Sequence, residues 1–314
     1  MKLGIDMGGM SIKMGLVNEE NKIIGRITIP TDLTVPYQTL VERMADAVRQ
    51  MLENAGMTLE QCGGIGIGSP GTIDAKQGVI LYSNNFGWEN VPIVEELKKH
   101  LDTRIEIAND ADAAALGEVC AGAAEGAENA VLLTLGTGVG SGVILDKKIF
   151  RGAMPGGCEL GHLSIRYDGI RCTCGRKGCL EAYASASALL RIAREKAAEH
   201  PESIMNEMCG NDLEQMNGKI PFDAAKAGDE AGMETVKEYE GYLACGIANV
   251  INTFRPEKVI LGGGVAAQKD TLTAPLKDLV KDMCFGGSHG HIADIVTSVL
   301  GNDAGIIGAA NLVV

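Results

Sequence analysis

The chain has 314 residues, of which 46% are hydrophobic, 22% charged and only 4% aromatic, and its formal net charge is −13. This length suits one large α/β domain or two lobes, built around an aliphatic core. The acidic balance leaves no basic stripe for nucleic acid. Neither a signal peptide nor an apolar run of about 18 residues is present, so we expect a cytoplasmic protein without a membrane partner.

The first 120 residues predict strands that alternate with helices. Residues 1–17 read as strand, glycine turn and strand, and residues 22–30 as another strand. Residues 39–56 carry apolar side chains at helical spacing and stop at Gly56. Further along come a strand that ends in a Gly-Pro turn at 62–71, a short helix at 93–101, and a strand at 103–110 that runs into an alanine-rich helix at 111–119.

The pattern begins again near residue 130. Residues 129–149 are once more strand, glycine turn and strand, and GIDMGGMSIKMGLV (4–17) resembles LTLGTGVGSGVILD (133–146). This weak internal duplication predicts two related lobes. The remainder is mostly helical, at 186–200 and 232–254, with one apolar strand that enters glycines at 258–267 and a closing apolar helix at 303–313.

Three turns between strands are rich in glycine, at 6–11, 134–142 and 262–264. Glycine lets a backbone turn sharply and direct several amides at one anion, which favours phosphate binding. Ordinary β-hairpin turns are the alternative for any single turn. GIGSPG at 66–71 satisfies G-x-G-x-x-G, but Pro70 removes an amide where a helix should begin. No G-x-x-x-x-G-K-[ST] motif occurs, which excludes a P-loop.

Two acidic positions lie at the ends of predicted strands. Asp6 ends the first strand, where it could hold Mg²⁺ through water or satisfy turn amides. Asn109 and Asp110 end a later strand, and a carboxylate beside an amide suits a general base that orients a substrate hydroxyl. Asp110 could also cap the following helix, and from the residues alone the cap is favoured.

His162, Cys172, Cys174 and Cys179 form the pattern H-x9-C-x-C-x4-C. Three thiolates and one imidazole fill a tetrahedral site, which predicts a structural Zn²⁺ without an open position for water. Disulfides are the alternative, but they are disfavoured inside cells, where the scattered cysteines are expected to be reduced. The metal would fix a loop that presents Glu159 and Glu181, either as ligands of sugar hydroxyls or as solvated surface residues.

These motifs together resemble the ROK family of sugar kinases, and within it the bacterial glucokinases, over essentially the whole chain. GIDMGGMSIKMGLV is similar to the first phosphate loop of the family, TLGTGVGSG to the second, and VILGGGV to the adenosine-side turn. GIGSPGTID and NNFGW resemble sugar-side segments, and ANDADAAALGE resembles the catalytic segment. CELGH and CTCGRKGCLEAYAS resemble the zinc signature, which is the most specific of these motifs.

The resemblance implies an actin-like (ribonuclease H-like) α/β fold of two lobes with a duplicated core and a cleft between them. It implies ATP-dependent phosphorylation of a hexose, glucose first, at the 6-hydroxyl, with ATP, Mg²⁺ and structural Zn²⁺ as cofactors. Asp110 would be the general base. Sugar ligands would be Gly71, Asn85, Asn109, Asp110, Glu159, His162 and Glu181. ATP ligands would be Asp6, Gly8, Gly9, Ser11, Lys13, Gly136, Thr137, Gly138, Gly262, Gly263 and Gly264.

Three positions depart from the family pattern. Met10 stands where the family usually has a threonine, Ala108 replaces a frequent glutamate, and Asp112 replaces a frequent asparagine. Kinases of fructose, allose, mannose or N-acetylmannosamine stay open as alternatives, as do a polyphosphate donor and a sugar-sensing protein without catalysis. The family's repressors carry a DNA-binding helix-turn-helix before the kinase-like part, whereas Met1 leads here directly into the first strand.

The sequence also predicts the division into lobes. Residues 1–118 with 302–314 are expected to form a small lobe, and residues 119–301 a large lobe with the zinc loop and helices for dimerisation. On family grounds we expect a homodimer or a homotetramer.

Overall fold

The computed structural model describes residues 1–290 and 292–313, and these form two compact units. Unit 1 comprises residues 1–132, 142–158 and 299–314, and unit 2 comprises residues 133–141 and 159–298. The lobes predicted from the sequence stay a prediction. Within the described residues, no helix is both long and apolar enough to span a membrane.

Unit 1 is built on a five-stranded sheet whose strand order is β3-β2-β1-β4-β8. The first three strands are antiparallel neighbours, and β1, β4 and β8 run parallel. Their bounds are β1 (Lys2–Met7), β2 (Ser11–Val17), β3 (Ile23–Pro30), β4 (Ile65–Ser69) and β8 (Ile105–Asn109). The helices of this unit are α1 (Tyr37–Asn54), α2 (Ile93–Lys98), α3 (Asp110–Ala121) and α10 (Asp303–Ala310).

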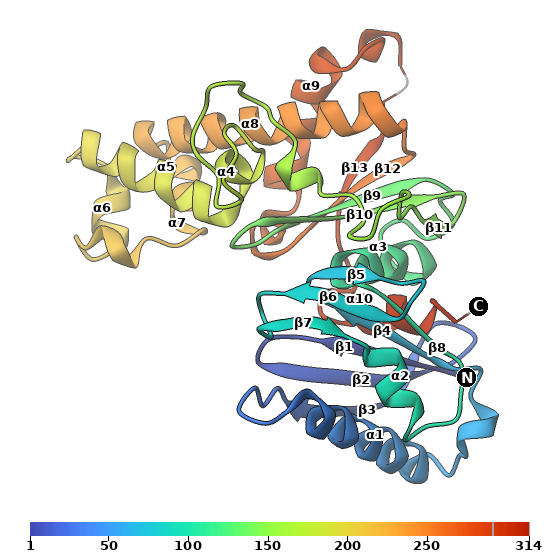
Figure 1. Ribbon diagram of the computed structural model, residues 1–314. Helices are drawn as coiled ribbons and strands as arrows, with labels where there is room; N and C mark the ends of the chain where they lie inside the picture. The colour runs from blue at the N-terminus through green and yellow to red at the C-terminus, as the bar shows by residue number, and fades with distance from the viewer. Residues whose placement is uncertain (291, 314) are drawn as a thin grey trace. The chain divides into compact units, whose positions relative to one another are not determined.

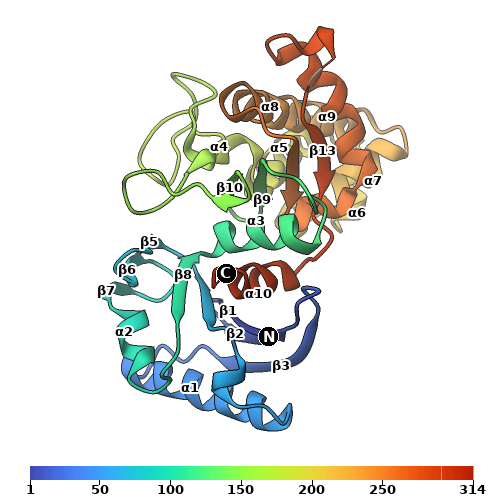
Figure 2. The ribbon, with the colours of Figure 1, turned by 90° about the vertical axis from the view of Figure 1, so that its right-hand side faces the viewer.

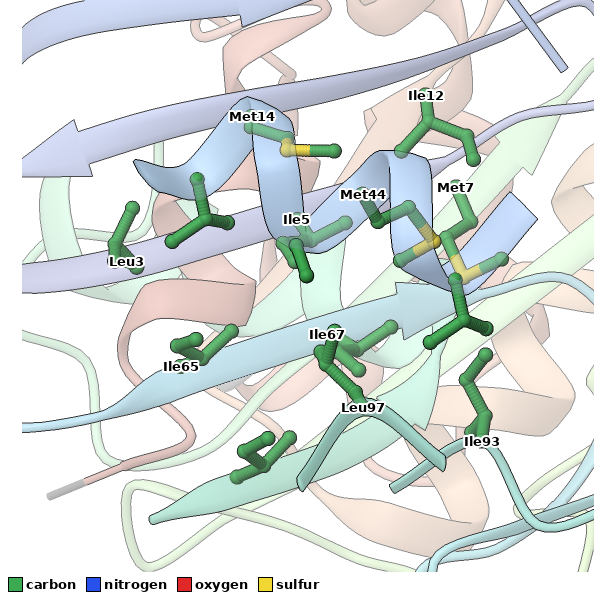
Figure 3. Close-up of a cluster of buried hydrophobic side chains, with 14 of the residues drawn as sticks. Leu3, Ile5, Met7, Ile12, Met14, Met44, Ile65, Ile67, Ile93 and Leu97 are labelled. Carbon is green, nitrogen blue, oxygen red and sulfur yellow. The ribbon is translucent and has the colours of Figure 1, made fainter. Parts of the chain in front are cut away.

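Alternation along the strands directs apolar side chains to one face of this sheet. Leu3, Ile5 and Met7 of β1 are at most 1% exposed, and they form a core with side chains of β2, β4, α1 and α2 (Figure 3). The opposite face is covered by α10, whereas α1 lies below the sheet in Figure 2. A Cβ at Gly66 would collide with the Ala309 carbonyl oxygen, so glycine allows α10 to approach β4 closely.

A second five-stranded sheet has the order β11-β10-β9-β12-β13. Its strands are β9 (Ala130–Leu135), β10 (Val139–Leu145), β11 (Lys148–Ile149), β12 (Lys258–Gly262) and β13 (Asp294–Thr297). The division between the units passes through β9 and β10. Numbered from its own first strand, each sheet has the order 3-2-1-4-5, so the duplication predicted from the two glycine turns is confirmed at the level of topology.

Unit 2 is mainly helical around the 25-residue helix α8 (Glu230–Phe254) (Figure 1). This helix begins at an N-cap, where Asp229 accepts a hydrogen bond from Gly232 N. It packs against its neighbours α4, α5, α7 and α9. The other helices of the unit are α4 (Glu181–Ala184), α5 (Ala186–Glu199), α6 (Ile204–Met208), α7 (Ile220–Lys226) and α9 (Asp270–Met283).

A three-stranded sheet in unit 1 was not expected from the sequence. Its strands β5 (Thr72–Asp74), β6 (Val79–Ser83) and β7 (Trp88–Val91) are antiparallel neighbours in chain order. The strands are three to five residues long, which is too short to show a clear alternation of apolar and polar side chains. This sheet carries Asn85 in the turn between β6 and β7.

Candidate functional site

Asp6 occupies the face of the first sheet that is covered by α10. The same alternation that buries Ile5 and Met7 on one face places Asp6 on the other, where a Cβ at Gly305 would lie 2.9 Å from the carboxyl carbon. Lys13 is its cross-strand partner on β2. Burial raises the pKa of Asp6, Lys13 lowers this pKa, and the negative charge of Asp110 raises it further. Asp6 and Asp110 therefore belong to one acidic cluster within unit 1.

The first glycine turn joins β1 to β2. Gly8 N donates to the Ser11 carbonyl at 3.0 Å, and Thr31 Oγ1 donates to the Gly8 carbonyl at 2.6 Å. Gly9 is exposed, and Met10 at the tip of the turn is 91% exposed. The turn is thus held by Thr31, the residue that follows β3, whereas its tip faces solvent in unit 1.

Asp110 is the first residue of α3, and the helix is capped by Asn109 rather than by Asp110. Asn109 keeps an extended backbone at the end of β8, and its Oδ1 accepts hydrogen bonds from Ala111 N at 2.8 Å and Asp112 N at 3.4 Å. The cap that the sequence assigned to Asp110 is therefore wrong by one residue. The Asp110 carboxylate accepts a hydrogen bond from Ala111 N at 3.0 Å. Burial raises its pKa, and hydrogen bonds from the backbone of Ala111 and Asp110 and from the Asn109 side chain lower this pKa by less. A carboxylate in this position is a stronger proton acceptor than an exposed aspartate.

Gly71 and Asn85 lie near these groups in unit 1. Asn109 Nδ2 donates to the Gly71 carbonyl at 3.1 Å. Gly71 has a φ of +117°, and a Cβ there would collide with the Tyr82 carbonyl, so only glycine fits. A Cβ at Gly9 would lie 3.8 Å from Asn85 Nδ2, which places Asn85 beside the first glycine turn.

A cavity of about 560 Å³ opens within unit 1 next to Asn109. Ala108, Asn109 and Asp112 line one side, and residues 151–157 line another. Asp110, Gly71 and Asn85 do not line this cavity. Of the sugar ligands that the sequence predicted in unit 1, only Asn109 therefore contributes to its wall.

In unit 2, His162, Cys172, Cys174 and Cys179 come together as the sequence pattern predicted. One ligand atom from each lies within 4.8 Å of the others. His162 Nδ1 is 3.7 Å from Cys172 Sγ, and Cys174 Sγ is 3.6 Å from Cys179 Sγ. None of the nine cysteines, all within the described residues, forms a disulfide, so the alternative of disulfides is not supported. Three sulfur atoms and one imidazole at these separations are compatible with one tetrahedral metal ion.

Glu181 connects the cysteine cluster to the second glycine turn. Its Oε1 accepts hydrogen bonds from Thr173 Oγ1 at 3.2 Å and from Cys172 Sγ at 3.4 Å. Its Oε2 accepts from Val139 N at 3.0 Å, and a Cβ at Gly138 would collide with this oxygen. Both carboxylate oxygens of Glu181 therefore already accept hydrogen bonds within unit 2.

Glu159 and His162 bracket one short turn of 3₁₀-helix, Leu160–His162. The Glu159 carbonyl accepts from His162 N at 3.0 Å, whereas the Glu159 side chain is exposed. Because Nδ1 of His162 faces the thiols, Nε2 lies on the opposite side of the ring. The turn thus presents one carboxylate and one ring nitrogen next to the cysteine cluster.

The second and third glycine turns also lie in unit 2. Ser187 Oγ donates to the Thr137 carbonyl at 2.9 Å, and Gly136 N donates to the Gly138 carbonyl at 3.0 Å. The third turn begins where β12 ends, and a Cβ at Gly263 would lie 2.5 Å from the Leu135 carbonyl oxygen at the start of the second turn. The stretches 136–138 and 262–264 are therefore neighbours.

Comparison with known proteins assigns the chain that carries these motifs to a family. The model of the ROK family matches residues 2–314. This chain belongs to the ROK family. It is 36% identical over 312 residues to a glucokinase of Thermotoga maritima, which covers 99% of this chain and 96% of that protein.

Two solved structures are similar over nearly the whole of this ROK chain. The crystal structure of a ROK family glucokinase from Streptomyces griseus in complex with glucose and AMPPNP has a TM-score of 0.78 at 31% identity, with 99% of this chain and 98% of that chain covered. The ROK hexokinase from Thermus thermophilus has a TM-score of 0.80 at 32% identity, with coverage of 99% and 97%. The actin-like α/β class expected from the sequence is confirmed.

The three departures from the ROK pattern differ in their surroundings. Ala108 and Asp112 both line the cavity beside Asn109, and each is at most 4% exposed. Met10 lies at the exposed tip of the first glycine turn. Two of the substitutions therefore change the wall of one cavity, whereas the third changes a surface in contact with solvent.

Sequence reasoning missed the side chains that hold the ROK motifs in place. Thr31 fixes the first glycine turn and Ser187 the second. Gly305 leaves room for Asp6 beneath α10. These three residues lie 20 or more positions from the motif residues they contact, so no local pattern could reveal them.

Proposed function

We propose that this ROK protein is an ATP-dependent glucose kinase that transfers the γ-phosphoryl group to the 6-hydroxyl of glucose. The observation that carries the proposal is the 36% identity to a glucokinase over 99% of the chain. It is supported by the similarity to a glucokinase that was crystallised with glucose and AMPPNP. Kinases of fructose, allose, mannose or N-acetylmannosamine are the alternatives within the same chemistry.

Asp110 is the proposed general base. Its carboxylate takes the proton of the 6-hydroxyl as the oxygen attacks the γ-phosphorus, and the bond between the γ-phosphorus and the bridging oxygen breaks to release ADP. Its position at the start of α3 supports this role, because Asn109 rather than Asp110 caps the helix, so the Asp110 carboxylate is not used as the cap. Burial raises its pKa, which strengthens it as a proton acceptor.

The proposed sugar ligands come from both units. Unit 1 would contribute Asn109 and Asp110, with Gly71 and Asn85 as companions, and unit 2 would contribute Glu159, His162 and Glu181. Hydroxyl groups of a hexose are bound well by carboxylate, amide and imidazole groups that are held in fixed positions. For His162, Nδ1 faces the thiols, which leaves Nε2 for the sugar.

The proposed nucleotide site consists of the three glycine turns. Gly8, Gly9, Ser11 and Lys13 would act on the phosphates from unit 1, together with Mg²⁺ held near Asp6. Gly136, Thr137, Gly138, Gly262, Gly263 and Gly264 would act from unit 2, where the two turns are neighbours. When bound, Mg²⁺ neutralises charge on the phosphates as the phosphoryl group is transferred. Polyphosphate is the alternative donor.

Zinc is the metal that fits the cluster of three cysteines and one histidine in unit 2. The donor set is soft and complete, which is typical of a structural site. Residues that would hold it are His162, Cys172, Cys174 and Cys179. The proposed role is to fix the turn that presents Glu159 and His162. Assembly as a homodimer or homotetramer and a cytoplasmic location stay predictions.

A coupled assay of ADP release over a panel of hexoses tests the proposed function. We expect glucose to give the highest kcat/KM. A higher value with another hexose would replace glucose as the substrate while retaining the chemistry. If no sugar stimulates ADP release but glucose still raises the melting temperature, the protein binds sugar without catalysis. Polyphosphate in place of ATP in the same assay identifies the donor.

A further inference from the structure

A second cavity of unit 1, of about 500 Å³, lies at the opposite end of α3 from Asp110. Leu116 and Cys120 of α3 line it, together with the turn between β10 and β11, Arg151, and the residues that follow α10. None of the predicted sugar, nucleotide or metal ligands contributes to its wall. Cys120 is ten residues after Asp110, which corresponds to about 15 Å along a helix. The cavity is therefore separate from the proposed catalytic group.

This cavity is cationic in a protein whose net charge is −13. Its lining holds three cations, Lys147, Lys148 and Arg151, against one carboxylate, that of Asp146. The other two described cavities do not share this excess. The cavity beside Asn109, whose lining also includes Arg151, has two cations and three carboxylates, and the cavity between α5 and α8 has two of each. A positive excess in one hollow of an acidic protein points to an anionic ligand.

Two of the cations, Lys147 and Lys148, lie in or directly after a firmly held hairpin turn. Asp146 and Lys147 both have positive φ, of 51° and 62°, as in a tight two-residue turn. Asp146 N donates to Asn129 Oδ1 at 3.1 Å and Lys147 N to the Glu128 carbonyl at 2.8 Å, which ties the turn to the start of β9. The lysine backbones are thus fixed before any ligand arrives, which lowers the cost of binding.

The three cationic side chains have few ion-pair partners within the described residues. Lys148 and Arg151 form no ion pair there. Lys147 Nζ is 3.7 Å from Glu128 Oε1, and both of these side chains are more than 60% exposed. Such a pair contributes little and can be exchanged for a ligand at small cost. All three charges are therefore available to an anion in the cavity.

The rest of the lining consists of apolar side chains and of Asn311, whose side chain forms hydrogen bonds with its neighbours. Leu116 is 7% exposed, and Ile149 and Leu312 are half-buried. Beside them, Lys2 Nζ donates to Asn311 Oδ1 at 3.0 Å, and Asn311 Nδ2 donates in turn to Asn21 Oδ1 at 2.9 Å. A volume of about 500 Å³ is in the range of small-molecule sites.

We propose that this cavity binds a small organic anion with at least two negative charges and an apolar body, such as a phosphorylated carboxylic acid. The charges would pair with Lys147, Lys148 and Arg151, and the body would contact Leu116 and Leu312. Cys120, whose thiol pKa is raised by burial and lowered by nearby Lys2, lies in the wall, where a bound ligand covers it.

Calorimetric titration with phosphoenolpyruvate at low ionic strength tests the proposal, with glucose and AMPPNP present to fill the proposed catalytic site. We expect one phosphoenolpyruvate per chain, bound more tightly than inorganic phosphate. The double variant Lys147→Gln/Lys148→Gln should bind at least about tenfold more weakly, because two charged partners are lost. The matched control Lys22→Gln/Arg43→Gln removes two cations of unit 1 that line none of the described cavities, and should bind like the wild type.

Several outcomes would overturn the proposal. These are an absence of binding at millimolar phosphoenolpyruvate, equal affinity in Lys147→Gln/Lys148→Gln and the wild type, or an equal loss in the control variant. If inorganic phosphate binds as tightly as phosphoenolpyruvate, the proposed contact of the ligand body with Leu116 and Leu312 is wrong. As a second readout, phosphoenolpyruvate should slow alkylation of Cys120, followed by peptide mass spectrometry, and leave half-buried Cys245 of unit 2 unchanged. Equal rates with and without the ligand would contradict the location.

Discussion

The two units hold their proposed functional groups by different means. In unit 1, Asp110 follows a buried strand and begins a 12-residue helix, so a capped junction of regular elements fixes its backbone. In unit 2, Glu159 and His162 belong to residues 159–180, where regular structure is limited to one 3₁₀ turn and two isolated bridges, Ser164↔Cys179 and Arg171↔Lys177. The first group is placed by the regular hydrogen bonds of a strand and a helix, and the second by turn hydrogen bonds together with side-chain contacts.

The difference indicates what the cysteine cluster does for the protein. A segment without helices or long strands relies on other contacts besides its turn hydrogen bonds if it is to present a carboxylate and an imidazole in fixed positions. Glu181 contributes by bonding the cluster to the second glycine turn. A metal ion held by His162, Cys172, Cys174 and Cys179 would contribute the rest. Unit 2 should therefore respond to metal loss and unit 1 should not.

The largest effect is expected from Cys179→Ser, which removes a fully buried member of the cluster. We expect loss of bound zinc, measured by metal analysis, and a fall in kcat/KM for glucose of about 100-fold or more, since changes even outside the first ligand shell cost 10–100-fold. Cys245→Ser, which changes a cysteine of α8 outside the cluster, is the matched control and should retain zinc and activity. Full activity of a zinc-free Cys179→Ser protein would show that the metal does not order the sugar-binding turn.

A smaller effect is expected at the cap of α3. Asn109→Ala should lower the free energy of unfolding by about 1 kcal/mol and weaken glucose binding, because the residue both caps the helix and is a proposed sugar ligand. Asn109→Ser retains a capping oxygen, so it should restore stability without restoring glucose affinity.

Ser185→Ala is the control: it removes the cap of α5, where Ser185 Oγ accepts a hydrogen bond from Ala188 N at 3.1 Å. This variant should lose stability but bind glucose like the wild type. Denaturant unfolding and glucose titration of the three variants separate the two roles. If Asn109→Ser recovers both stability and glucose affinity, Asn109 is not a sugar ligand.

The smallest effect on function is expected at a buried carboxyl of unit 2 that lies outside both proposed sites. Glu240 of α8 is 6% exposed, its Oε1 has no hydrogen-bond partner within the described residues, and burial raises its pKa to about 7. Because the folded pKa exceeds the unfolded value of about 4.3, stability should fall as the pH rises from about 4 to 7 and stay low above that. Glu240→Gln should remove this dependence.

At pH 8, Glu240→Gln should gain about 1–3 kcal/mol of unfolding free energy with unchanged turnover. Below pH 4 the variant and the wild type should be equally stable. Glu238→Gln, at an exposed position two residues away, is the control and should match the wild type at both pH values. A stability difference that does not change with pH would show that the Glu240 carboxyl is not buried in solution.

The sequence was most informative where one local pattern determines the structure. The repeated strand, glycine turn and strand at 4–17 and 133–146 predicted the duplication, and both sheets have the same strand order. The spacing of His162 and the three cysteines predicted their convergence, because four ligands within 18 residues have few ways to meet. Both predictions rest on short segments whose pattern can be read within the segment itself.

The sequence was least informative where distant segments meet or where neighbouring residues compete. Asn109 and Asp110 are both good caps, and only the end of β8 decides that Asn109 is the one used. The short strands between Thr72 and Val91 have too few residues to show a period. Thr31, which bonds the Gly8 carbonyl, contacts it through the pairing of β2 with β3, and no motif records that pairing.

The most direct test of the account is glucose affinity and turnover of Asp110→Asn, measured on the same preparation. The amide keeps the shape of the side chain at the start of α3 but cannot accept the proton of the 6-hydroxyl. We predict that kcat falls by a factor of about 100 to 10,000 while the Kd for glucose stays close to that of the wild type. Loss of glucose binding together with turnover would contradict the account, because Asp110 would then hold the structure rather than act as the base.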